Sequence, residues 1–381
     1  MNKESIKNIF LSAAIIIMSA CGDISPDNKD FTKVEINLDT KENIVKLSDI
    51  ADTVTFIPLE TKEESRLGSI DKLILENGNY IIVDKQLASA VFVFDQRGKF
   101  LHKIGRKGKA KNEYIELTDA AVDNDNVYIY DARGKKVICY SMDGSYIETY
   151  PFEYTATEFK NVKGSTFAFY CTYSHNADLA EGDKMPNLII CDLKSGEMKK
   201  DMMFASSCSY DAIPVVPNNM NPFLYSSLSD EVFDVGEDGK APVAKIDYGK
   251  QYQERLSEFI KKVSSGLAGM NEFQEAQAKG SFPMLINFMD AGNAYFTFCV
   301  KGATLYYDFL FKKSGTNVCA TAEGEIPVKD DFYGCMTIMP KAAGDGKIYV
   351  DIDPSATAGE NLPVDVRPDE NPVLAVIKLK E

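Results

Sequence analysis

The chain has 381 residues, of which 45% are hydrophobic and 26% charged, and its formal net charge is -15 at pH 7. It is long enough to bury a sizeable core. Its acidic balance disfavours nucleic acid or an anionic membrane surface as a broad partner, because both require a positive protein surface. The sequence contains only two histidines, His102 and His175, which excludes a three-histidine metal site.

The N-terminal segment has the pattern of an export signal. Lys3 and Lys7 form a charged start, residues 9–18 are almost wholly apolar, and small residues precede Cys21. An apolar stretch of this length is too short to span a bilayer, which needs about 20 residues. We therefore expect a cleaved signal peptide and no membrane-spanning helix in this segment.

The residues before Cys21 resemble the bacterial lipobox, whose cysteine becomes the lipid-carrying first residue after cleavage. The resemblance implies that residues 1–20 are removed, that Cys21 is lipidated, and that residues 21–32 tether a domain of residues 33–381. Lipidation would hold the protein to the membrane without a spanning helix. The expected location is the cell envelope, as an outer-membrane lipoprotein that is periplasmic or surface-exposed. An ordinary signal peptide followed by a chance cysteine is the alternative.

Beyond the tether, short runs of apolar, β-branched and aromatic residues alternate with Gly, Asn and Asp turns, which is typical of an all-β chain. Two stretches repeat at a spacing of about 47 residues. Residues 82–84, 91–95 and 98–101 are echoed by residues 129–131, 137–140 and 143–147. Fainter copies occupy residues 188–203, 228–247, 294–321 and 347–379. A repeat of this length in strand-rich sequence is typical of propeller blades of four strands each.

The strand count predicts an all-β, six-bladed β-propeller. Roughly 23 strand-like runs lie between Ser69 and Leu379, and the run Thr53–Leu59 brings the total to about six sheets of four. We expect Thr53–Leu59 to complete the last blade beside Val373–Leu379, which leaves no open sheet edge. The absence of Trp excludes a standard WD-repeat pattern. A pair of β-sandwiches remains the structural alternative.

Several motifs resemble those of the six-bladed β-propeller lipoproteins of Bacteroidetes, which are relatives of NHL-type and TolB-like propellers. The resemblance covers most of residues 45–381, although this chain has Ala110-Lys111-Asn112 where the family usually has Gly-Pro-Gly. The matching segments are residues 99–108 followed by Glu113-Tyr114, residues 49–52 leading into 56–60, residues 229–233 and residues 371–374.

Long connections are expected on one face of the propeller, and short turns on the other. Loops longer than about 12 residues inside a compact domain are usually functional or disordered, so we predict a binding face there. The long connections are residues 105–116, 173–186, 249–282 and 351–371. The longest is a partly helical insertion between blades 4 and 5, because Tyr252, Leu256, Phe259, Ile260 and Val263 recur at helical spacing. Its apolar stripe is expected to pack on the propeller rim, with a partner-binding helix as the alternative.

All the candidate ligand-binding residues except Arg133 lie in these loops. A basic stretch, Lys103 to Lys111, suits a uronic acid, a phosphate or an acidic partner, although a solvated surface loop is the simpler interpretation. The turn Asp123-Asn124-Asp125-Asn126 is interpreted as a hairpin turn on the opposite face, without the full calcium-loop pattern. The full candidate set is Arg106, Lys107, Lys109, Tyr114, Arg133, Tyr173, His175, Asp178, Arg367 and Asp369.

Seven cysteines follow Cys21, and their wide spacing contains no C-x-x-C pair. Most lie inside apolar strand-like runs, so we expect small buried hydrophobic residues. A disulfide such as Cys171 to Cys191 stays open as an alternative.

The sequence contains no G-x-S-x-G, phosphate-cradling loop or H-E-x-x-H motif. We therefore predict a binding or interaction module without catalytic residues, metal or cofactor, whose partner is a glycan, a peptide or an outer-membrane protein. One alternative is a metal-dependent lactonase-like or lyase-like enzyme, which predicts three or four Asp, Glu or Asn side chains converging on the channel mouth. Another is a structural subunit of an outer-membrane complex with an exposed apolar patch.

Overall fold

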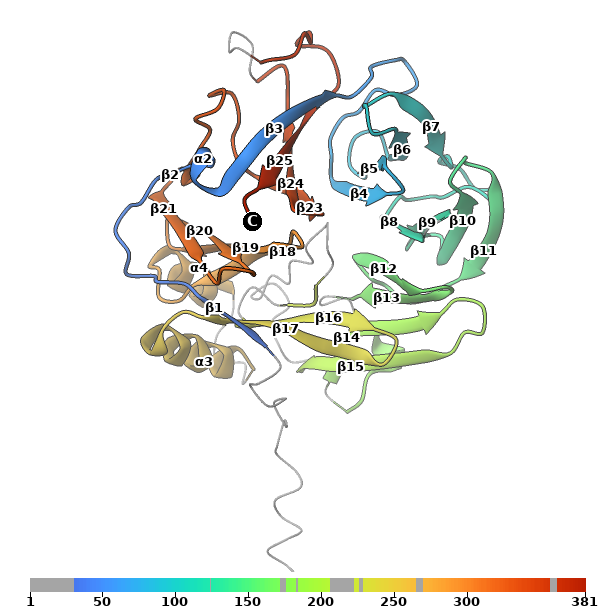
Figure 1. The fold of residues 1–381 in the computed structure, drawn as a ribbon. Helices are drawn as coiled ribbons and strands as arrows, with labels where there is room; N and C mark the ends of the chain where they lie inside the picture. Colours follow the sequence, from blue (N-terminus) through green and yellow to red (C-terminus); the bar gives the residue numbers. More distant parts are fainter. Residues whose placement is uncertain are drawn as a thin grey trace, which may run out of the picture.

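A computed structural model describes residues 31–123, 125–171, 176–182, 184–205, 223–225, 229–264, 270–356 and 362–381. Six β-sheets are arranged radially around a central axis, as the blades of a propeller (Figure 1). Five of these sheets contain four strands, and the fourth blade contains three among the described residues. The all-β, six-bladed propeller predicted from the sequence is confirmed.

The first three blades follow the chain in simple antiparallel order, from an inner to an outer strand. Blade 1 consists of β4 (Lys72–Glu76), β5 (Asn79–Asp84), β6 (Ala90–Phe94) and β7 (Phe100–Ile104). Blade 2 consists of β8 (Asp119–Asp123), β9 (Asn126–Asp131), β10 (Lys136–Ser141) and β11 (Tyr146–Pro151). Blade 3 consists of β12 (Glu158–Lys163), β13 (Thr166–Tyr170), β14 (Lys184–Asp192) and β15 (Met198–Ala205), and the 3-10 helix η1 (Ala177–Leu179) lies in its β13–β14 connection.

Of the last three blades, blades 4 and 6 each include a strand from the N-terminal part of the chain. Blade 4 consists of β16 (Glu231–Gly236), β17 (Gly239–Asp247) and β1 (Thr32–Glu35). Blade 5 consists of β18 (Met284–Asp290), β19 (Ala294–Lys301), β20 (Thr304–Phe311) and β21 (Asn317–Glu323). Blade 6 consists of β23 (Pro340–Gly344), β24 (Lys347–Ile352), β25 (Val373–Leu379) and β3 (Ala51–Pro58). The short elements β2 (Val45–Lys46) and β22 (Val328–Lys329) form a parallel pair, and α2 (Leu47–Ile50) precedes β3.

The ring closes in blade 6, where the N-terminal strand β3 pairs with the C-terminal strand β25. The antiparallel register runs from Val373 opposite Pro58 to Leu379 opposite Ala51. Both strands contribute to an apolar cluster shared with blade 5, which includes Ile377 and Phe309. The closure expected between residues 53–59 and 373–379 is therefore confirmed, and it joins the two ends of the domain in one sheet.

Blade 4 departs from the expected four antiparallel strands. Its outer strand is β1, which pairs with β17 in parallel, from Thr32 opposite Ala244 to Glu35 opposite Asp247. The other side of β16 carries an isolated antiparallel bridge between Phe233 and Leu224. A four-residue strand with one buried side chain, Val34, gives too weak a periodic signal to be recognised from sequence.

After β1, the chain follows the outer edge of blade 5 before it enters blade 6 (Figure 1). Lys301 Nζ and Tyr306 Oη both donate to the carbonyl of Leu38, at 2.7 and 3.0 Å. Asn43 and Thr321 form an antiparallel bridge through their backbones. The N-terminal arm, residues 31–58, therefore covers or completes the outer edges of blades 4, 5 and 6.

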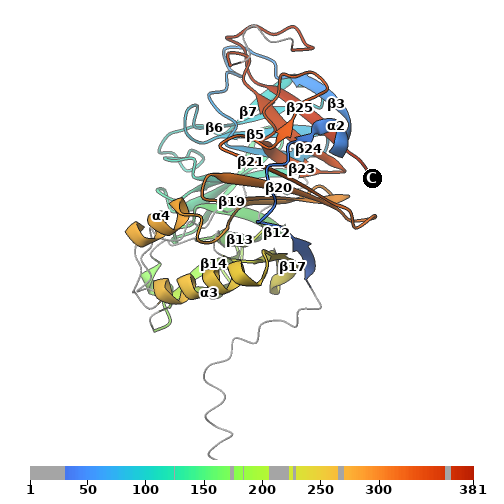
Figure 2. The same cartoon turned by 90° about the vertical axis from the view of Figure 1, so that its left-hand side faces the viewer.

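Strand direction sorts the connections between two faces of the ring. Turns such as Asn77-Gly78 and Gly164-Ser165, which join the first to the second strand of a blade, lie on what we call the short-turn face. The opposite face, which we call the long-loop face, carries the connections 59–71, 105–118, 324–339 and 353–372. Figure 2 shows α3 and α4 on one side of the ring and the C-terminus on the other.

The repeated Asp at the end of the second strand has a structural role in blades 1 and 2. The Asp84 carboxylate accepts hydrogen bonds from the backbone N–H groups of Gly68, Ser69, Leu87 and Ala88. Asp131, 47 positions later, accepts from Ile115, Glu116 and Gly134 in the same manner. Each carboxylate thus ties the incoming loop to the following turn and satisfies donors that the strands leave unpaired.

The insertion between blades 4 and 5 contains the helices α3 (Lys250–Ser264) and α4 (Met270–Ala278). Tyr252, Leu256 and Phe259 of α3 are buried in the apolar cluster between blades 4 and 5. The predicted packing of the apolar stripe on the rim is confirmed. Among the described residues, no helix combines the length and apolar character needed to cross a membrane.

The described cysteines are free thiols, and all but Cys319 are buried. Cys171 and Cys191 both lie in the apolar cluster of blades 2 and 3, so the disulfide left open by the sequence is not formed. Burial raises the pKa of the Cys191 thiol to about 11, which keeps it protonated and unreactive near neutral pH. Cys21 and Cys208 lie outside the described residues.

Candidate functional site

The basic loop, residues 105–116, is held in a defined shape by its own backbone. Gly108 donates to the carbonyl of Tyr114, and Tyr114 donates to the carbonyl of Arg106. The Glu113 carboxylate accepts from the backbone N–H of Ala110 and from the Arg106 guanidinium, at 3.0 and 2.6 Å. These donors lower the pKa of Glu113, so it stays ionised beside Arg106. Arg106, Lys107 and Lys109 are exposed, as the sequence predicted.

Tyr114 differs from the other candidates in this loop because its side chain is fully buried. Its hydroxyl donates to the carbonyl of Ser89 in the β5–β6 turn of blade 1, at 2.8 Å. The ring packs in the apolar cluster between blades 1 and 2. The sequence assigned this side chain to ligand contact, whereas the structure gives it a position where a ligand cannot reach it.

Two further candidates lie on the same face in blades 2 and 3. Arg133 is exposed in the β9–β10 turn. Lys136, which follows that turn, donates to the carbonyls of Ala110 and Glu113 and holds the basic loop against blade 2. Asp178 is exposed on η1 in blade 3. The remaining candidates of this region, Tyr173 and His175, lie outside the described residues.

Arg367 and Asp369 lie in the long β24–β25 connection of blade 6 and are exposed. The Arg367 guanidinium pairs with Glu370 at 3.1 Å and with Asp369 at 3.5 Å. Arg66 donates to the carbonyl of Asp369, which ties this loop to the start of blade 1. In the described parts of the chain, no hydrogen bond or ion pair joins these two residues to the basic loop. The sequence therefore placed these loops on one face of the propeller, but the contacts among the described residues do not join them into one compact site.

A second feature, which the sequence analysis missed, is an aromatic loop of residues 330–336 in the connection between blades 5 and 6. Asp331 of this loop accepts hydrogen bonds from the backbone N–H and the hydroxyl of Ser48 in α2. The Asp330 carboxylate accepts hydrogen bonds from four backbone N–H groups within the loop. Phe332 and Tyr333 remain 37% and 45% exposed, and the Tyr333 ring meets Phe56 edge-on at 5.0 Å between centroids. The loop therefore presents two aromatic rings to solvent from a fixed backbone. The four backbone N–H groups bonded to Asp330 belong to Phe332, Tyr333, Cys335 and Met336.

At the long-loop end of the axis, the first residues of the inner strands form a buried ionic network. Asp119 Oδ2 lies 2.8 Å from Lys72 Nζ, and Asp119 Oδ1 lies 3.0 Å from Lys85 Nζ. Lys85 also lies 3.6 Å from Glu158 Oε1. Burial alone would raise the pKa of Asp119, but Lys72 and Lys85 lower it. Glu158 has its pKa raised by burial and by Asp119. Two acids and two lysines thus form one buried cluster that joins blades 1, 2 and 3.

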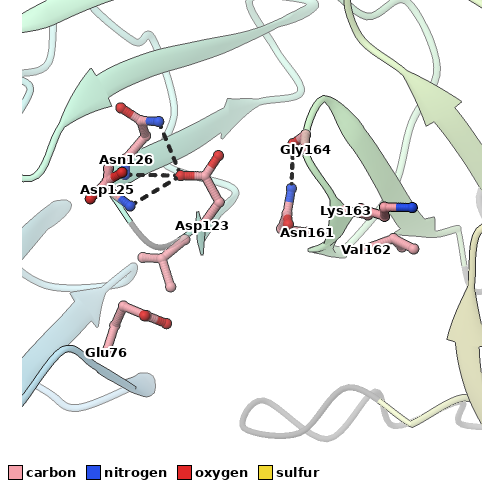
Figure 3. A pocket seen from close by; sticks show the side chains of 9 residues that line it. Glu76, Asp123, Asp125, Asn126, Asn161, Val162, Lys163 and Gly164 are labelled. Carbon is pink, nitrogen blue, oxygen red and sulfur yellow. Dashed lines mark hydrogen bonds between the residues drawn. The ribbon is translucent and has the colours of Figure 1, made fainter.

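The opposite end of the same strands forms a pocket of about 510 Å³ on the short-turn face (Figure 3). It is lined by the end of β4, the β8–β9 turn and the β12–β13 turn. Burial raises the pKa of Glu76, and the charges of Asp123 and Asp125 raise it further. The repeat could have revealed this site, because Glu76 and Asp123 are 47 positions apart. The lining residues are Glu76, Val122, Asp123, Asp125, Asn126, Asn161, Val162, Lys163 and Gly164.

The fold is similar to that of solved bacterial proteins. A protein of Bacteroides fragilis NCTC 9343, described as a candidate exported protein, superposes with a TM-score of 0.68 at 16% identity and covers 92% of this chain and 100% of its own. A member of the DUF4221 family from Bacteroides vulgatus ATCC 8482 has a TM-score of 0.48 at 12% identity, with 89% of this chain and 99% of its own covered. At these identities the first similarity supports the propeller fold alone.

No curated protein matches the sequence. One family model matches residues 31–378, which is nearly the whole described propeller from β1 to the end of β25. The chain therefore belongs to the family described as a domain of unknown function, DUF4934.

Proposed function

We propose that this protein is a lipid-anchored binding module of the cell envelope that engages a partner through its long-loop face. Its N-terminal segment supports export and lipidation of Cys21. The similar Bacteroides fragilis protein is described as a candidate exported protein, which agrees with an extracytoplasmic location. The outer membrane, in a periplasmic or surface-exposed position, is the location that the lipobox resemblance favours.

The distribution of exposed apolar side chains carries this proposal. Half of the exposed large hydrophobic residues in the described chain lie in long-loop-face connections, namely Leu87, Phe332, Tyr333 and Met339. Exposed aromatic rings and methionine are typical of the centres of protein interfaces. Since the Asp330 hydrogen bonds already fix the aromatic loop, binding there would cost little conformational entropy.

We propose an envelope protein, or an extended peptide segment of one, as the partner. The exposed set combines aromatic rings with the aliphatic side chain of Leu87 and the thioether of Met339. A glycan site would place hydrogen-bonding side chains around the rings, whereas the Asp330 carboxylate beside Phe332 and Tyr333 is occupied by the backbone of its own loop. Glycan binding by the basic loop, with Arg106, Lys107 and Lys109, is retained as the alternative outcome of the test.

Site-specific photo-crosslinking in intact cells tests the proposal. A photoreactive phenylalanine at Phe332 is expected to crosslink a defined envelope protein, and the same probe at Leu101 on the outer strand β7 serves as the control. Both positions are comparably exposed, at 37% and 43%. Equal crosslinking at the two positions, or none at Phe332 together with binding of a charged glycan that Lys107→Ala abolishes, would contradict a protein partner on the aromatic loop.

The lactonase-like or lyase-like alternative has one observation in its favour. It predicted acidic and amide side chains converging at a channel mouth, and Glu76, Asp123, Asp125, Asn126 and Asn161 do line the short-turn pocket. Among the residues that the structure describes, however, no group of three His, Cys, Asp or Glu side chains is placed to hold a metal ion. Binding therefore remains the function that these residues support best.

A further inference from the structure

The axial pocket on the short-turn face lies at the other end of the propeller from the proposed partner surface. We propose that it is a second binding site, specific for an organic cation that carries a guanidinium or ammonium group. Its volume of about 510 Å³ lies within the usual range for small-molecule sites. Three consecutive blades build its walls, so its shape is set by paired strands rather than by a single loop.

The side chains that surround the pocket come from two sides. Figure 3 shows Glu76 and Asp123 on one side of the hollow, and Asn161 and Lys163 across from them. Val122 and Val162 add an apolar component to the lining. This combination of aliphatic wall and polar groups suits the methylene stem and the charged head of an alkyl ammonium or guanidinium.

Each side-chain donor of the lining makes one hydrogen bond within the protein. Asn126 Nδ2 donates to Asp123 Oδ1 at 3.0 Å, and Asn161 Nδ2 donates to the carbonyl of Gly164 at 2.8 Å. The Lys163 ammonium donates to Glu237 Oε2 at 3.0 Å, outside the pocket lining. Asp123 also accepts within the protein, from Asn126 and from the Tyr128 hydroxyl. Among the described residues, no hydrogen bond occupies the carboxylates of Glu76 and Asp125, so the complementary ligand is one rich in N–H donors.

The charge of the lining favours the same ligand. Three carboxylates, those of Glu76, Asp123 and Asp125, face a pocket whose only lining cation in the described chain is Lys163, and that ammonium is paired with Glu237. Burial and the two aspartates raise the pKa of Glu76, which reports a negative potential that a bound cation would relieve. These carboxylates do not form a group placed for a bare metal ion among the described residues, so a broad organic cation fits them better.

Calorimetric titration of the purified protein tests this site directly. The probes are N-acetyl-arginine amide and N-acetyl-lysine amide, and N-acetyl-citrulline amide is the matched neutral control. We expect one of the charged probes to bind saturably with a Kd below about 1 mM and the citrulline probe to bind at least about tenfold more weakly. Glu76→Gln removes one charge while it retains the shape, and we expect it to weaken the charged probe by roughly tenfold.

Asp345→Asn is the control variant for this experiment. Asp345 lies in the β23–β24 turn, also a short-turn-face connection, but does not line the pocket. Its φ of 51° is a conformation that Asn adopts readily, so the variant should fold normally and bind the probe with unchanged affinity. The proposal is overturned if neither charged probe binds, if citrulline binds as well as arginine, or if both variants lose affinity equally. It is equally overturned if Ca²⁺ alone binds in a manner that Glu76→Gln abolishes, since that result assigns a metal site.

Discussion

The same three inner strands carry charged residues at both ends of the propeller axis, but the two ends treat those charges differently. At the long-loop end, Asp119 is fully buried and lies within 3.0 Å of both Lys72 and Lys85. At the short-turn end, Glu76 and Asp123 line an open pocket without a lysine of their own. Lys72 and Glu76 begin and end β4, while Asp119 and Asp123 begin and end β8. One end is thus an internal ionic clamp, and the other is available to a ligand.

This difference distinguishes charges that stabilise the fold from charges that serve binding. A buried acid stays ionised only when it is paired with a cation, because removing an unpaired charge from water costs several kcal/mol. Without a cation its pKa rises and it becomes neutral. A partly exposed acid keeps its hydration and can remain unpaired at a small cost in stability. Neutralising one carboxylate at each end should therefore have opposite consequences.

The largest expected effect is at the clamp. Asp119→Asn removes the charge that pairs with both lysines, and leaves the buried Lys72 ammonium and the partly buried Lys85 ammonium without it. We expect a loss of about 3 to 5 kcal/mol in the free energy of unfolding, measured by urea denaturation. Asp234→Asn is the matched control, since its ion pair with Lys160 is half-exposed, and it should cost less than about 1 kcal/mol. Equal losses of unfolding free energy in the two variants would contradict the conclusion that the buried pair stabilises the fold more than the exposed one.

Among the described residues, Asp308 is a buried acid without a lysine partner, and it should make the stability of the protein depend on pH. Asp308 of β20 is fully buried, and its hydrogen-bond partners are Asn317 and the Cys319 thiol. Burial raises its pKa to about 7. Between about pH 4 and pH 7 the unfolded state therefore loses this proton while the folded state retains it, so stability falls as the pH rises through that window.

Asp308→Asn removes this titration and retains the acceptor for Asn317. Relative to the native chain, the variant should gain stability by roughly 2 to 4 kcal/mol from pH 4 to pH 7, since one unit of pKa corresponds to about 1.4 kcal/mol. Urea denaturation at a series of pH values measures the difference between the two curves. Curves that stay parallel would mean that the pKa of Asp308 is the same in the folded and unfolded states.

The fold was largely predictable because its signal is local and repeated. Turns such as Asn77-Gly78 and the Asp84 and Asp131 positions recur with the blade, and each has a short-range structural cause. The closing strand β3 was also predictable from its apolar run. The parallel strand β1 was not, because its pairing with β17 joins residues more than 200 positions apart through a segment with one buried side chain.

The candidate sites were less predictable because they depend on convergence in space. The basic loop was recognised by composition, yet composition could not show that Tyr114 turns inward to Ser89. The short-turn pocket joins Glu76, Asp123 and Lys163, which no local motif relates. Aligning the repeats would have placed Glu76 and Asp123 at equivalent strand ends, and this is the signal that the sequence did contain.

At the open end, Glu76→Gln is expected to leave the protein as stable as the native chain, or more stable by up to about 0.5 kcal/mol at pH 7, after allowance for screening by solvent. Burial and the nearby Asp123 and Asp125 raise the pKa of Glu76, so its ionisation opposes folding above that pKa. Urea denaturation of Glu76→Gln and Asp119→Asn at pH 7 measures whether each change raises or lowers the free energy of unfolding. A loss of stability similar to that of Asp119→Asn would show that Glu76 has a structural cation partner and would break the contrast between the two ends.

The smallest effect is expected for Arg106→Ala in the basic loop. The Arg106 side chain is 76% exposed, and its ion pair with Glu113 should contribute no more than a few tenths of a kcal/mol. The loop keeps its shape without this pair, because Gly108 and Tyr114 are bonded through their backbones and the Tyr114 hydroxyl holds Ser89. Thermal unfolding should therefore be unchanged in the variant. If a charged glycan or acidic partner then binds it more weakly, the loss reports recognition by the guanidinium, whereas a lowered melting temperature would make Arg106 part of the scaffold.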